Sequence, residues 1–317
     1  MKLLITRCLP DRVVAAAREA FDVTYRDSPL PMDIDETVAA LTGYDLVLPT
    51  LGDPFRAEAF ERAGQPRAKL LANFGVGYNH IDVAAAKAAG VAVTNTPGAV
   101  TDATADIAMT LILMSARRAA EGERLVRAGL WTGWHPVQML GLHVSGKVLG
   151  VVGMGRIGKA IAKRAQAGFG MEVVFFNRSP VADPGVPARQ LETLAEVMAA
   201  ADIVVVAVPG GPATHHLIDA AALAAMRPHA HLVNIARGDV VDEAALIAAL
   251  EAGRIGGAGL DVYEYEPKVP AALIARDDVT LLPHLGTAAL EVRESMGMMA
   301  VENLLAFKRG EALPNAV

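Results

Sequence analysis

The 317-residue chain has a single cysteine, no excess of positive charge and no long apolar run. Because Cys8 has no partner in the chain, no internal disulfide can form, and we expect a reducing compartment. The formal net charge of −6 argues against a nucleic-acid-binding surface, whose mark would be a basic patch. Charged residues near the start interrupt the apolar region of a signal peptide, and no apolar run approaches the ~20 residues that span a bilayer. We therefore expect a cytoplasmic protein that binds neither nucleic acid nor a membrane.

Apolar residues make up 53% of the chain and are arranged as short strands that alternate with alanine-rich helices. This pattern is typical of βαβ units on a parallel sheet, so the expected fold class is α/β with two doubly wound parallel-sheet domains. Residues 101–128 predict one long helix, 131–146 an irregular arm, and 287–307 a closing helix. We expect residues 1–98 and 288–317 to form one domain and 99–287, including an arm of about 101–146, the other, with a ligand cleft between them.

A glycine-rich loop follows the first strand of the second series, which is predicted over 147–152. Gly153 permits a tight turn, Gly155 lets a pyrophosphate approach the backbone, and Gly158 lets the following helix pack closely on the strand. The N-terminus of that helix offers free N–H groups and a partial positive charge to phosphates. The loop therefore predicts a dinucleotide cofactor.

The end of the next strand selects between the two nicotinamide cofactors. An acidic residue about 20 positions after the glycines holds the ribose 2′-hydroxyl of NAD. Here the strand runs into Asn177, Arg178 and Ser179, with no carboxylate, and a cation and a hydroxyl can bind a 2′-phosphate. We predict that NADP is preferred and that NAD remains possible; the alternative is a plain polar turn with Arg178 in solvent.

Three ionisable side chains follow apolar strands of the second series. Arg237 lies in NIARG, Glu266 in GLDVYEYEP together with Asp261, and His284 in LLPHLGT. Carboxyl ends of parallel strands meet at one edge of a sheet, which is where ligands bind in such folds. A cation can hold an anionic substrate and a His backed by a carboxylate can move a proton near pH 7. No spacing of His or acidic residues indicates a metal site. His80 is expected in the first turn of a helix over 81–89.

The chain resembles the D-isomer-specific 2-hydroxyacid dehydrogenases over nearly its whole length. The resemblance rests on six segments: NFGVGYNHIDV (73–83), VTNTPGAVTDATADIA (93–108), GVVGMGRIG (150–158), NIARG (234–238), DVYEYEP (261–267) and PHLGT (283–287). It implies two flavodoxin- or Rossmann-like domains and a homodimer built through the cofactor domains. It also assigns substrate binding to Arg237, the acid–base role to His284 and the role of its partner to Glu266. It also implies that the backbone N–H groups of Val76 and Gly77 bind the substrate carboxylate. The cofactor contacts that it implies, besides the residues above, are Thr104, Arg156, Ile157, Pro209, Thr214, Ala236, Asp261, His284 and Gly286.

The segment GLWTGWHPVQMLG is similar to the glyoxylate and hydroxypyruvate reductase branch of this family, in which Trp134 would reach the partner subunit's substrate site. The alternative for Trp134 is packing in the dimer interface. Formate dehydrogenases carry Gln where Glu266 stands, which argues against that branch. We expect NADPH-dependent reduction of glyoxylate and hydroxypyruvate to D-2-hydroxy acids. A larger 2-oxo acid such as an aryl pyruvate is the nearest alternative, and a dinucleotide-sensing corepressor is a more distant one.

Overall fold

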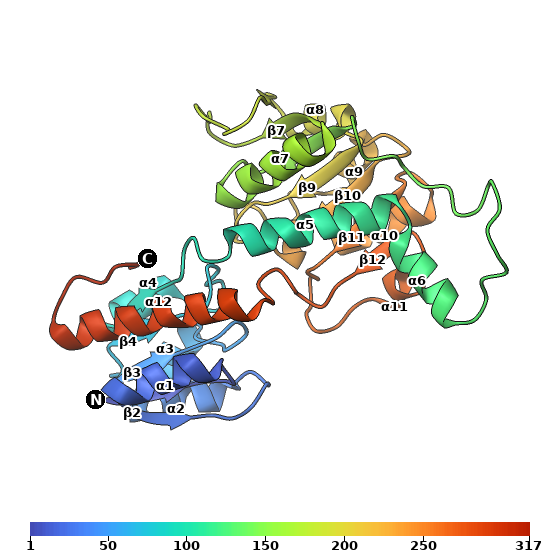
Figure 1. Ribbon diagram of the computed structural model, residues 1–317. Helices are drawn as coiled ribbons and strands as arrows, with labels where there is room; N and C mark the ends of the chain where they lie inside the picture. The colour runs from blue at the N-terminus through green and yellow to red at the C-terminus, as the bar shows by residue number, and fades with distance from the viewer. The chain divides into compact units, whose positions relative to one another are not determined.

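The computed structural model describes residues 1–317, which fall into two compact units. Unit 1 comprises residues 1–100 and 288–317, and unit 2 comprises residues 101–287 (Figure 1). Each unit is a parallel β-sheet flanked by helices, which confirms the predicted fold class. No helix is both long and apolar enough to cross a bilayer.

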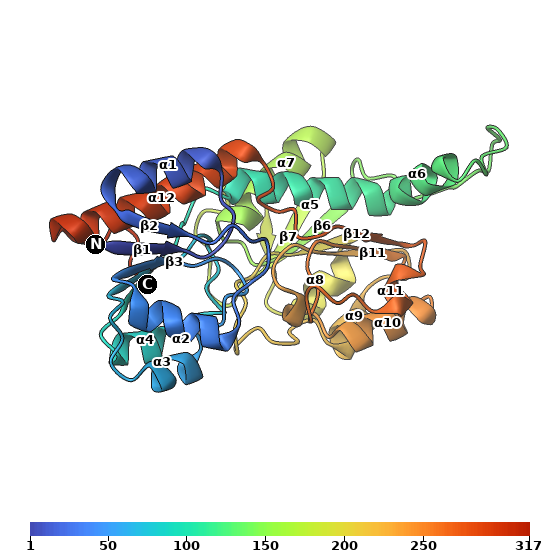
Figure 2. The ribbon, with the colours of Figure 1, turned by 90° about the horizontal axis from the view of Figure 1, so that it is seen from below.

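Unit 1 contains a five-stranded parallel sheet in the order β2-β1-β3-β4-β5. Its strands are β1 (Lys2–Ile5), β2 (Asp22–Tyr25), β3 (Leu46–Leu48), β4 (Leu70–Ala72) and β5 (Ala92–Thr94). Its helices are α1 (Asp11–Ala20), α2 (Ile34–Gly43), α3 (Ala57–Ala63), α4 (Val83–Ala88) and α12 (Leu290–Arg309). Helices α1 and α12 cover one face of the sheet and α2, α3 and α4 cover the other (Figure 2).

Successive strand residues in unit 1 enter different cores because side chains alternate between the two faces of a strand. Leu3 and Ile5 pack towards α1 and α12, whereas Leu4 packs towards α2 and α3. Both faces are covered, so the inner strands β1, β3 and β4 are almost entirely apolar, whereas the edge strand β2 alternates exposed and half-buried residues. This explains the short apolar runs that the sequence shows.

Unit 2 contains a seven-stranded parallel sheet in the order β12-β11-β10-β9-β6-β7-β8. Its strands are β6 (Val148–Val152), β7 (Glu172–Phe176), β8 (Arg189–Gln190), β9 (Ile203–Val206), β10 (His231–Asn234), β11 (Gly257–Leu260) and β12 (Val279–Leu281). Its helices are α5 (Thr101–Ala116), α6 (Ala119–Arg127), α7 (Arg156–Phe169), α8 (Leu194–Ala200), α9 (Ala220–Ala225), the 3₁₀ helix η1 (Gly238–Val240), α10 (Glu243–Glu251) and α11 (Ala271–Ile274). The strand order reverses between β6 and β9, and such a reversal opens a ligand crevice at the carboxyl edge.

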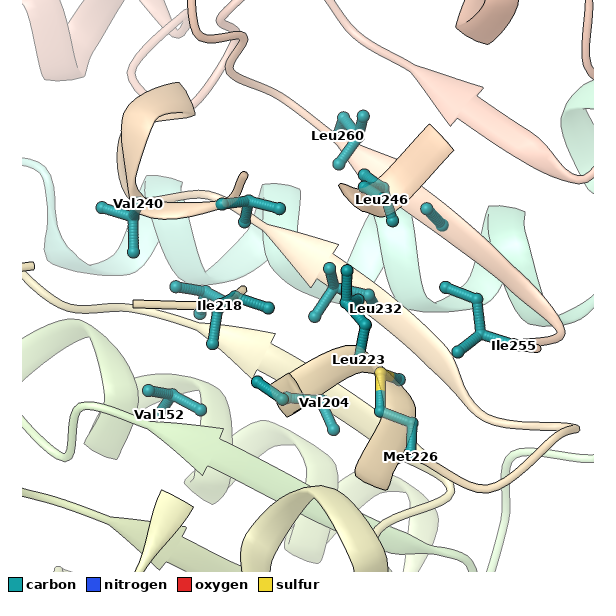
Figure 3. Packing of buried hydrophobic residues seen from close by; sticks show 14 of the residues in the cluster. Val152, Val204, Ile218, Leu223, Met226, Leu232, Val240, Leu246, Ile255 and Leu260 are labelled. Atoms are coloured by element: carbon teal, nitrogen blue, oxygen red, sulfur yellow. The ribbon is translucent and has the colours of Figure 1, made fainter. Parts of the chain in front are cut away.

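Helices cover both faces of this sheet as well. Helices α5 and α7 pack on one face, and α8, α9 and α10 pack on the other. On the face covered by α8, α9 and α10, Val204, Leu232 and Leu260 lie on three neighbouring strands. They pack against Leu223 of α9 and Leu246 of α10 (Figure 3). The dense apolar layer fixes the strands, and the carboxyl ends of the strands are thereby held in a defined order.

The single long helix predicted over 101–128 is wrong, because the chain forms α5 and α6 with a break between them. Arg118 lies in the break with a left-handed φ of 53°. The carbonyl of Ala116 accepts a hydrogen bond of 2.7 Å from the N–H of Leu142, so a distant segment satisfies the end of α5. A helix end needs partners for its last carbonyls, and here a tertiary contact provides one.

Gly297 of α12 lies directly against Val13 of α1, and this contact gives a stability prediction. A Cβ at 297 would overlap both methyl groups of Val13 and lie 3.0 Å from its Cβ, so rotating Val13 gives no relief. We expect Gly297→Ala to destabilise the protein by roughly 1–2 kcal/mol, because overpacking outweighs the gain in helix propensity. Gly168→Ala in α7, where a Cβ meets no atom within 4 Å, is the control and should be neutral or stabilising. Urea unfolding measures both, and equal effects would contradict the packing argument.

Candidate active site

The three predicted catalytic residues follow neighbouring strands of unit 2. Arg237 comes after β10, Glu266 after β11 and His284 after β12, and these strands are adjacent and parallel. Their carboxyl ends therefore lie at one edge of the sheet, as the sequence predicts. The structure brings Glu266 and His284 into contact. Arg237 lies close enough to Glu266 for its positive charge to lower the pKa of that carboxyl.

His284 and Glu266 form a hydrogen-bonded pair. The distance between His284 Nδ1 and Glu266 Oε2 is 2.9 Å, and 29% and 32% of the two side chains are exposed. The other oxygen of Glu266, Oε1, accepts the N–H of Tyr263 at 3.1 Å. A carboxylate can only accept, so Nδ1 of His284 carries a proton and the pair fixes the tautomer. His284 Nε2 has no hydrogen-bond partner within the protein and can therefore exchange a proton with a ligand.

The environment of Glu266 favours its ionised form. Burial tends to raise its pKa, but the hydrogen bond and charge of His284, the N–H of Tyr263 and the positive charge of Arg237 together lower the pKa below the 4.5 of an unperturbed glutamate. At neutral pH Glu266 is therefore a carboxylate. This carboxylate accepts the Nδ1 proton of His284 and holds the ring in one orientation.

The backbone of His284 is held in the left-handed region, with φ at 55°. Asp261, a buried residue that follows β11, holds this conformation from three points. Its backbone carbonyl accepts the N–H of His284 at 2.9 Å, and its carboxylate oxygens accept the N–H groups of Leu285 at 2.6 Å and Gly286 at 2.8 Å. Thr104 of α5 donates its hydroxyl to the carbonyl of Gly286 at 3.1 Å. Strained backbone of this kind persists only where its surroundings over-determine it, and it clusters at functional sites.

The buried position of Asp261 shifts the pKa of its own carboxyl group. Burial raises the pKa of Asp261, and the N–H groups of Leu285 and Gly286 and the charge of His284 oppose that rise. Of the predicted cofactor contacts, Thr104, Asp261 and Gly286 thus gather in one cluster behind His284. In this cluster they determine the position of the imidazole.

Arg237 lies in the segment between β10 and η1, and its guanidinium is largely enclosed. Its Nη1 donates to the carbonyl of Ala236 at 2.6 Å, whereas its buried Nε has no partner in the protein. Burial lowers the pKa of Arg237, and the charges of Glu266 and Asp239 oppose that change. Leaving a buried donor unpaired costs free energy, which an anionic ligand can recover.

Asn234 at the end of β10 is a site residue that the sequence analysis missed. Its side chain accepts the N–H of Ala236 at 3.0 Å and donates to the carbonyl of Arg237 at 2.9 Å. It therefore shapes the segment that carries Arg237 and the predicted cofactor contact Ala236. A buried amide at the end of an apolar strand, inside the NIARG motif, is the signal that could have revealed it.

The Arg237 segment packs directly on the Glu266 segment. A Cβ at Gly238 would overlap the backbone carbonyl of Tyr263, so only glycine allows this approach. Tyr263 supplies the N–H that holds Glu266. The segment with Arg237, the predicted anion-binding residue, is therefore in direct backbone contact with the segment that holds Glu266, the predicted partner of His284.

The glycine loop of unit 2 fits a dinucleotide. Gly153 has a φ of 100°, and a Cβ at Gly158 would overlap the Gly153 carbonyl, so the turn and the close approach both need glycine. Gly155 is exposed, and a Cβ there would meet open space that a pyrophosphate can occupy. Arg156 and Ile157 begin α7, where helix N–H groups have no intrahelical acceptor.

The turn after β7 contains the predicted selectivity residues. Asn177 Nδ2 donates to the carbonyl of Ser179 at 2.9 Å, and Gln190 Nε2 donates to the carbonyls of both residues at 3.2 Å. Arg178 is exposed and forms no ion pair. The backbone of the turn is thus held by amides, and the side chains of Arg178 and Ser179 are not used to hold it.

The remaining predicted residues lie elsewhere. In unit 2, Thr214 donates its hydroxyl to the Pro209 carbonyl at 2.7 Å and closes the loop after β9, while Trp134 is 79% exposed in the irregular segment after α6. Val76 and Gly77 belong to unit 1, in the loop that follows β4. Within unit 2, neither Thr214 nor Trp134 forms a hydrogen bond or ion pair with His284 or Glu266.

Comparisons with known proteins identify the family of the chain. The family model of the D-isomer specific 2-hydroxyacid dehydrogenase NAD-binding domain matches residues 109–286. A glyoxylate reductase from Thermococcus onnurineus is 42% identical, with the match covering 100% of this chain and 95% of the relative. A glycerate dehydrogenase from Hyphomicrobium methylovorum is 37% identical over 94% of this chain and 93% of its own length.

Among solved structures, an NADPH-dependent glyoxylate/hydroxypyruvate reductase from Sinorhizobium meliloti, in complex with NADP and malonate, is 34% identical with a TM-score of 0.89. That match covers 100% of this chain and 96% of the other. Both chains of the comparison are thus covered almost completely. The protein belongs to the D-isomer specific 2-hydroxyacid dehydrogenase family and is similar to its glyoxylate and hydroxypyruvate reductases.

Proposed function

We propose that the protein reduces glyoxylate and hydroxypyruvate to D-2-hydroxy acids with NADPH. The observation that carries the proposal is the 2.9 Å hydrogen bond between His284 Nδ1 and Glu266, which leaves Nε2 of the imidazole available to a substrate. The similarity to glyoxylate reductases and to a glycerate dehydrogenase supports small 2-oxo acids as the substrate class.

The residues of the site have distinct roles in this proposal. When bound, the dihydronicotinamide supplies a hydride to the carbonyl carbon of the substrate, so negative charge develops on the carbonyl oxygen. Protonated His284 donates the Nε2 proton to that oxygen, and Glu266 stabilises the imidazolium before the transfer. Arg237 binds the substrate carboxylate through its guanidinium. The carboxylate oxygens then accept hydrogen bonds from guanidinium N–H groups, among which the buried Nε has no acceptor within the protein. In unit 1, the N–H groups of Val76 and Gly77 are assigned to a carboxylate of the substrate.

The preference for NADPH is supported by the turn after β7. Residues 177–179 carry no carboxylate, so nothing there repels a 2′-phosphate. Arg178 is exposed and without an ion-pair partner, and Ser179 offers a hydroxyl. A phosphate binds such a pair through charge-assisted hydrogen bonds. We assign the remaining cofactor contacts to the glycine loop and to the segments at Pro209, Thr214, Ala236 and Asp261.

A homodimer is part of the proposal. The irregular segment after α6 exposes five large apolar residues, which a second subunit would cover: Leu130, Trp131, Trp134, Val137 and Leu140. Trp134, with 79% of its surface exposed, would reach the substrate site of the partner or pack in the interface.

Loss of NADPH absorbance with a panel of 2-oxo acids tests the function. We expect the largest kcat/KM with glyoxylate or hydroxypyruvate and a smaller one with phenylpyruvate; the opposite order would favour an aryl substrate. His284→Asn should lower kcat by about 10²- to 10⁴-fold, because the general acid is lost. Asn tolerates the left-handed backbone at 284, so the loop should keep its shape. NADPH affinity, from fluorescence titration, should fall far less than kcat, and near-native turnover would refute the role.

The lowered pKa of Glu266 predicts a pH-dependent stability difference. A carboxyl with a depressed folded-state pKa stabilises the fold above its unfolded pKa, and this stabilisation is lost as the pH falls through the folded value. Glu266→Gln should therefore lower Tm at pH 7, and the gap to the native protein should shrink as the pH falls below 4.5. Melting curves between neutral and acid pH measure the gap, with Glu19→Gln on the exposed face of α1 as the control. A gap that stays constant with pH would contradict the assigned cause.

Arg178 gives a prediction for the cofactor. Arg178→Ala should raise the KM for NADPH about tenfold and leave that for NADH nearly unchanged, because only NADPH carries the 2′-phosphate. Lys163→Ala removes an exposed positive charge from α7 and serves as the matched control. Equal changes for the two cofactors, or a native enzyme that prefers NADH, would overturn the assignment.

A further inference from the structure

The loop after β4 in unit 1 presents three successive peptide groups in an unusual way. The carbonyl of Gly75 accepts hydrogen bonds from Asn73 Nδ2 at 3.0 Å and from the N–H of Thr96 at 3.0 Å. The carbonyl of Gly77 accepts from the same Asn73 Nδ2 at 3.1 Å. Between them, the carbonyl of Val76 accepts from Asn95 Nδ2 at 2.9 Å. All three carbonyls are thus held by two asparagine side chains and one backbone N–H.

Holding a carbonyl also aims the N–H of the next residue. In a trans peptide the C=O of one residue and the N–H of the following residue point in opposite directions. The bonds to the Gly75 and Val76 carbonyls therefore turn the N–H groups of Val76 and Gly77 away from Asn73 and Asn95. Neither N–H has an acceptor within the protein. Two adjacent free N–H groups of fixed direction form a small anion-binding site.

Asn73 is oriented by a third side chain. It is completely buried, and its Oδ1 lies 3.1 Å from His80 Nε2. Both hydrogens of Asn73 Nδ2 are used by the carbonyls, so Oδ1 faces the imidazole and His80 Nε2 must be the donor. His80 precedes α4, which begins at Val83 behind the N-cap Asp82, so its expected place in the first helical turn is wrong. Its actual place lets it fix the amide of Asn73.

Burial alone does not require these bonds. Gly75, Val76 and Gly77 are only half-buried, so water could solvate their carbonyls. Unpaired carbonyls are costly only where water is excluded. The asparagine side chains therefore fix the orientation of the peptide groups in the loop, and do more than supply hydrogen-bond donors to its carbonyls.

We propose that Asn73 and Asn95 are positioning residues that aim the N–H groups of Val76 and Gly77 at the carboxylate of the 2-oxo acid, with His80 fixing the amide of Asn73. This inference rests on the proposed function, because the ligand is the substrate of that reaction. Neither asparagine touches the substrate. Both act through the backbone of the loop.

The test compares Asn73→Ala and Asn95→Ala with the unsubstituted enzyme. For each variant we expect KM for glyoxylate to rise about tenfold or more, with a smaller change in kcat, because the loop no longer presents both N–H groups. Oxalate, titrated calorimetrically into the complex with NADP, should bind more weakly by a similar factor. NADPH affinity should stay within about twofold, and the shape of the pH profile should not change because no proton-transfer group is altered.

Thr37→Val is the matched control, since it removes a buried hydroxyl that donates to the Asp33 carbonyl at 2.7 Å in the same unit. It should lower Tm without changing KM for glyoxylate. Asparagine variants that keep the native KM and oxalate affinity, or that lose NADPH affinity to the same degree, would overturn the positioning role. A native enzyme that reduces no 2-oxo acid would instead overturn the proposed function, and this inference with it.

Discussion

The buried carboxylate of Asp261 is the contact on which the geometry of the site depends. It accepts the N–H groups of Leu285 and Gly286, and its own carbonyl accepts the N–H of His284. These bonds offset the cost of a left-handed residue at 284 and set the direction of the imidazole. The pair with Glu266 then only has to fix the ring and its tautomer, because the backbone is already in place.

The two units use one structural device in different ways. In both, a loop at the carboxyl end of a parallel strand is shaped by an amide or carboxylate that lies beneath it. Asn234 and Asp261 act on loops that carry charged side chains, whereas Asn73 acts on a loop that presents only backbone N–H groups. A parallel sheet with both faces covered gives these buried polar groups fixed positions.

Local patterns made much of the fold predictable. Apolar runs and glycine spacing predict β6, the turn at Gly153 and α7, because that information lies within a few neighbouring residues. The break between α5 and α6 was not predictable in the same way, since it depends on the N–H of Leu142, which is distant in sequence from Ala116. A propensity argument cannot anticipate a tertiary contact of that kind.

The candidate site shows the same division. Arg237, Glu266 and His284 could be placed at one sheet edge because each follows its own strand. The roles of Asn234 and Asn73 depend on which backbone groups surround each amide, and a sequence motif does not state this. His80 was placed wrongly although Asp82, which caps α4 by accepting the N–H of Ala85 at 2.9 Å, was a readable signal for a later helix start.

Gln190 has a consequence for which positions of this chain can vary. Because its amide, reaching from β8, ties down the main chain of residues 177–179, exchanging the side chain at 178 leaves the scaffold intact. The identity of the side chain at this position is thereby separable from the folding of the turn. A substitution at this one exposed position can therefore accumulate or be engineered without re-optimising the remainder of the sheet.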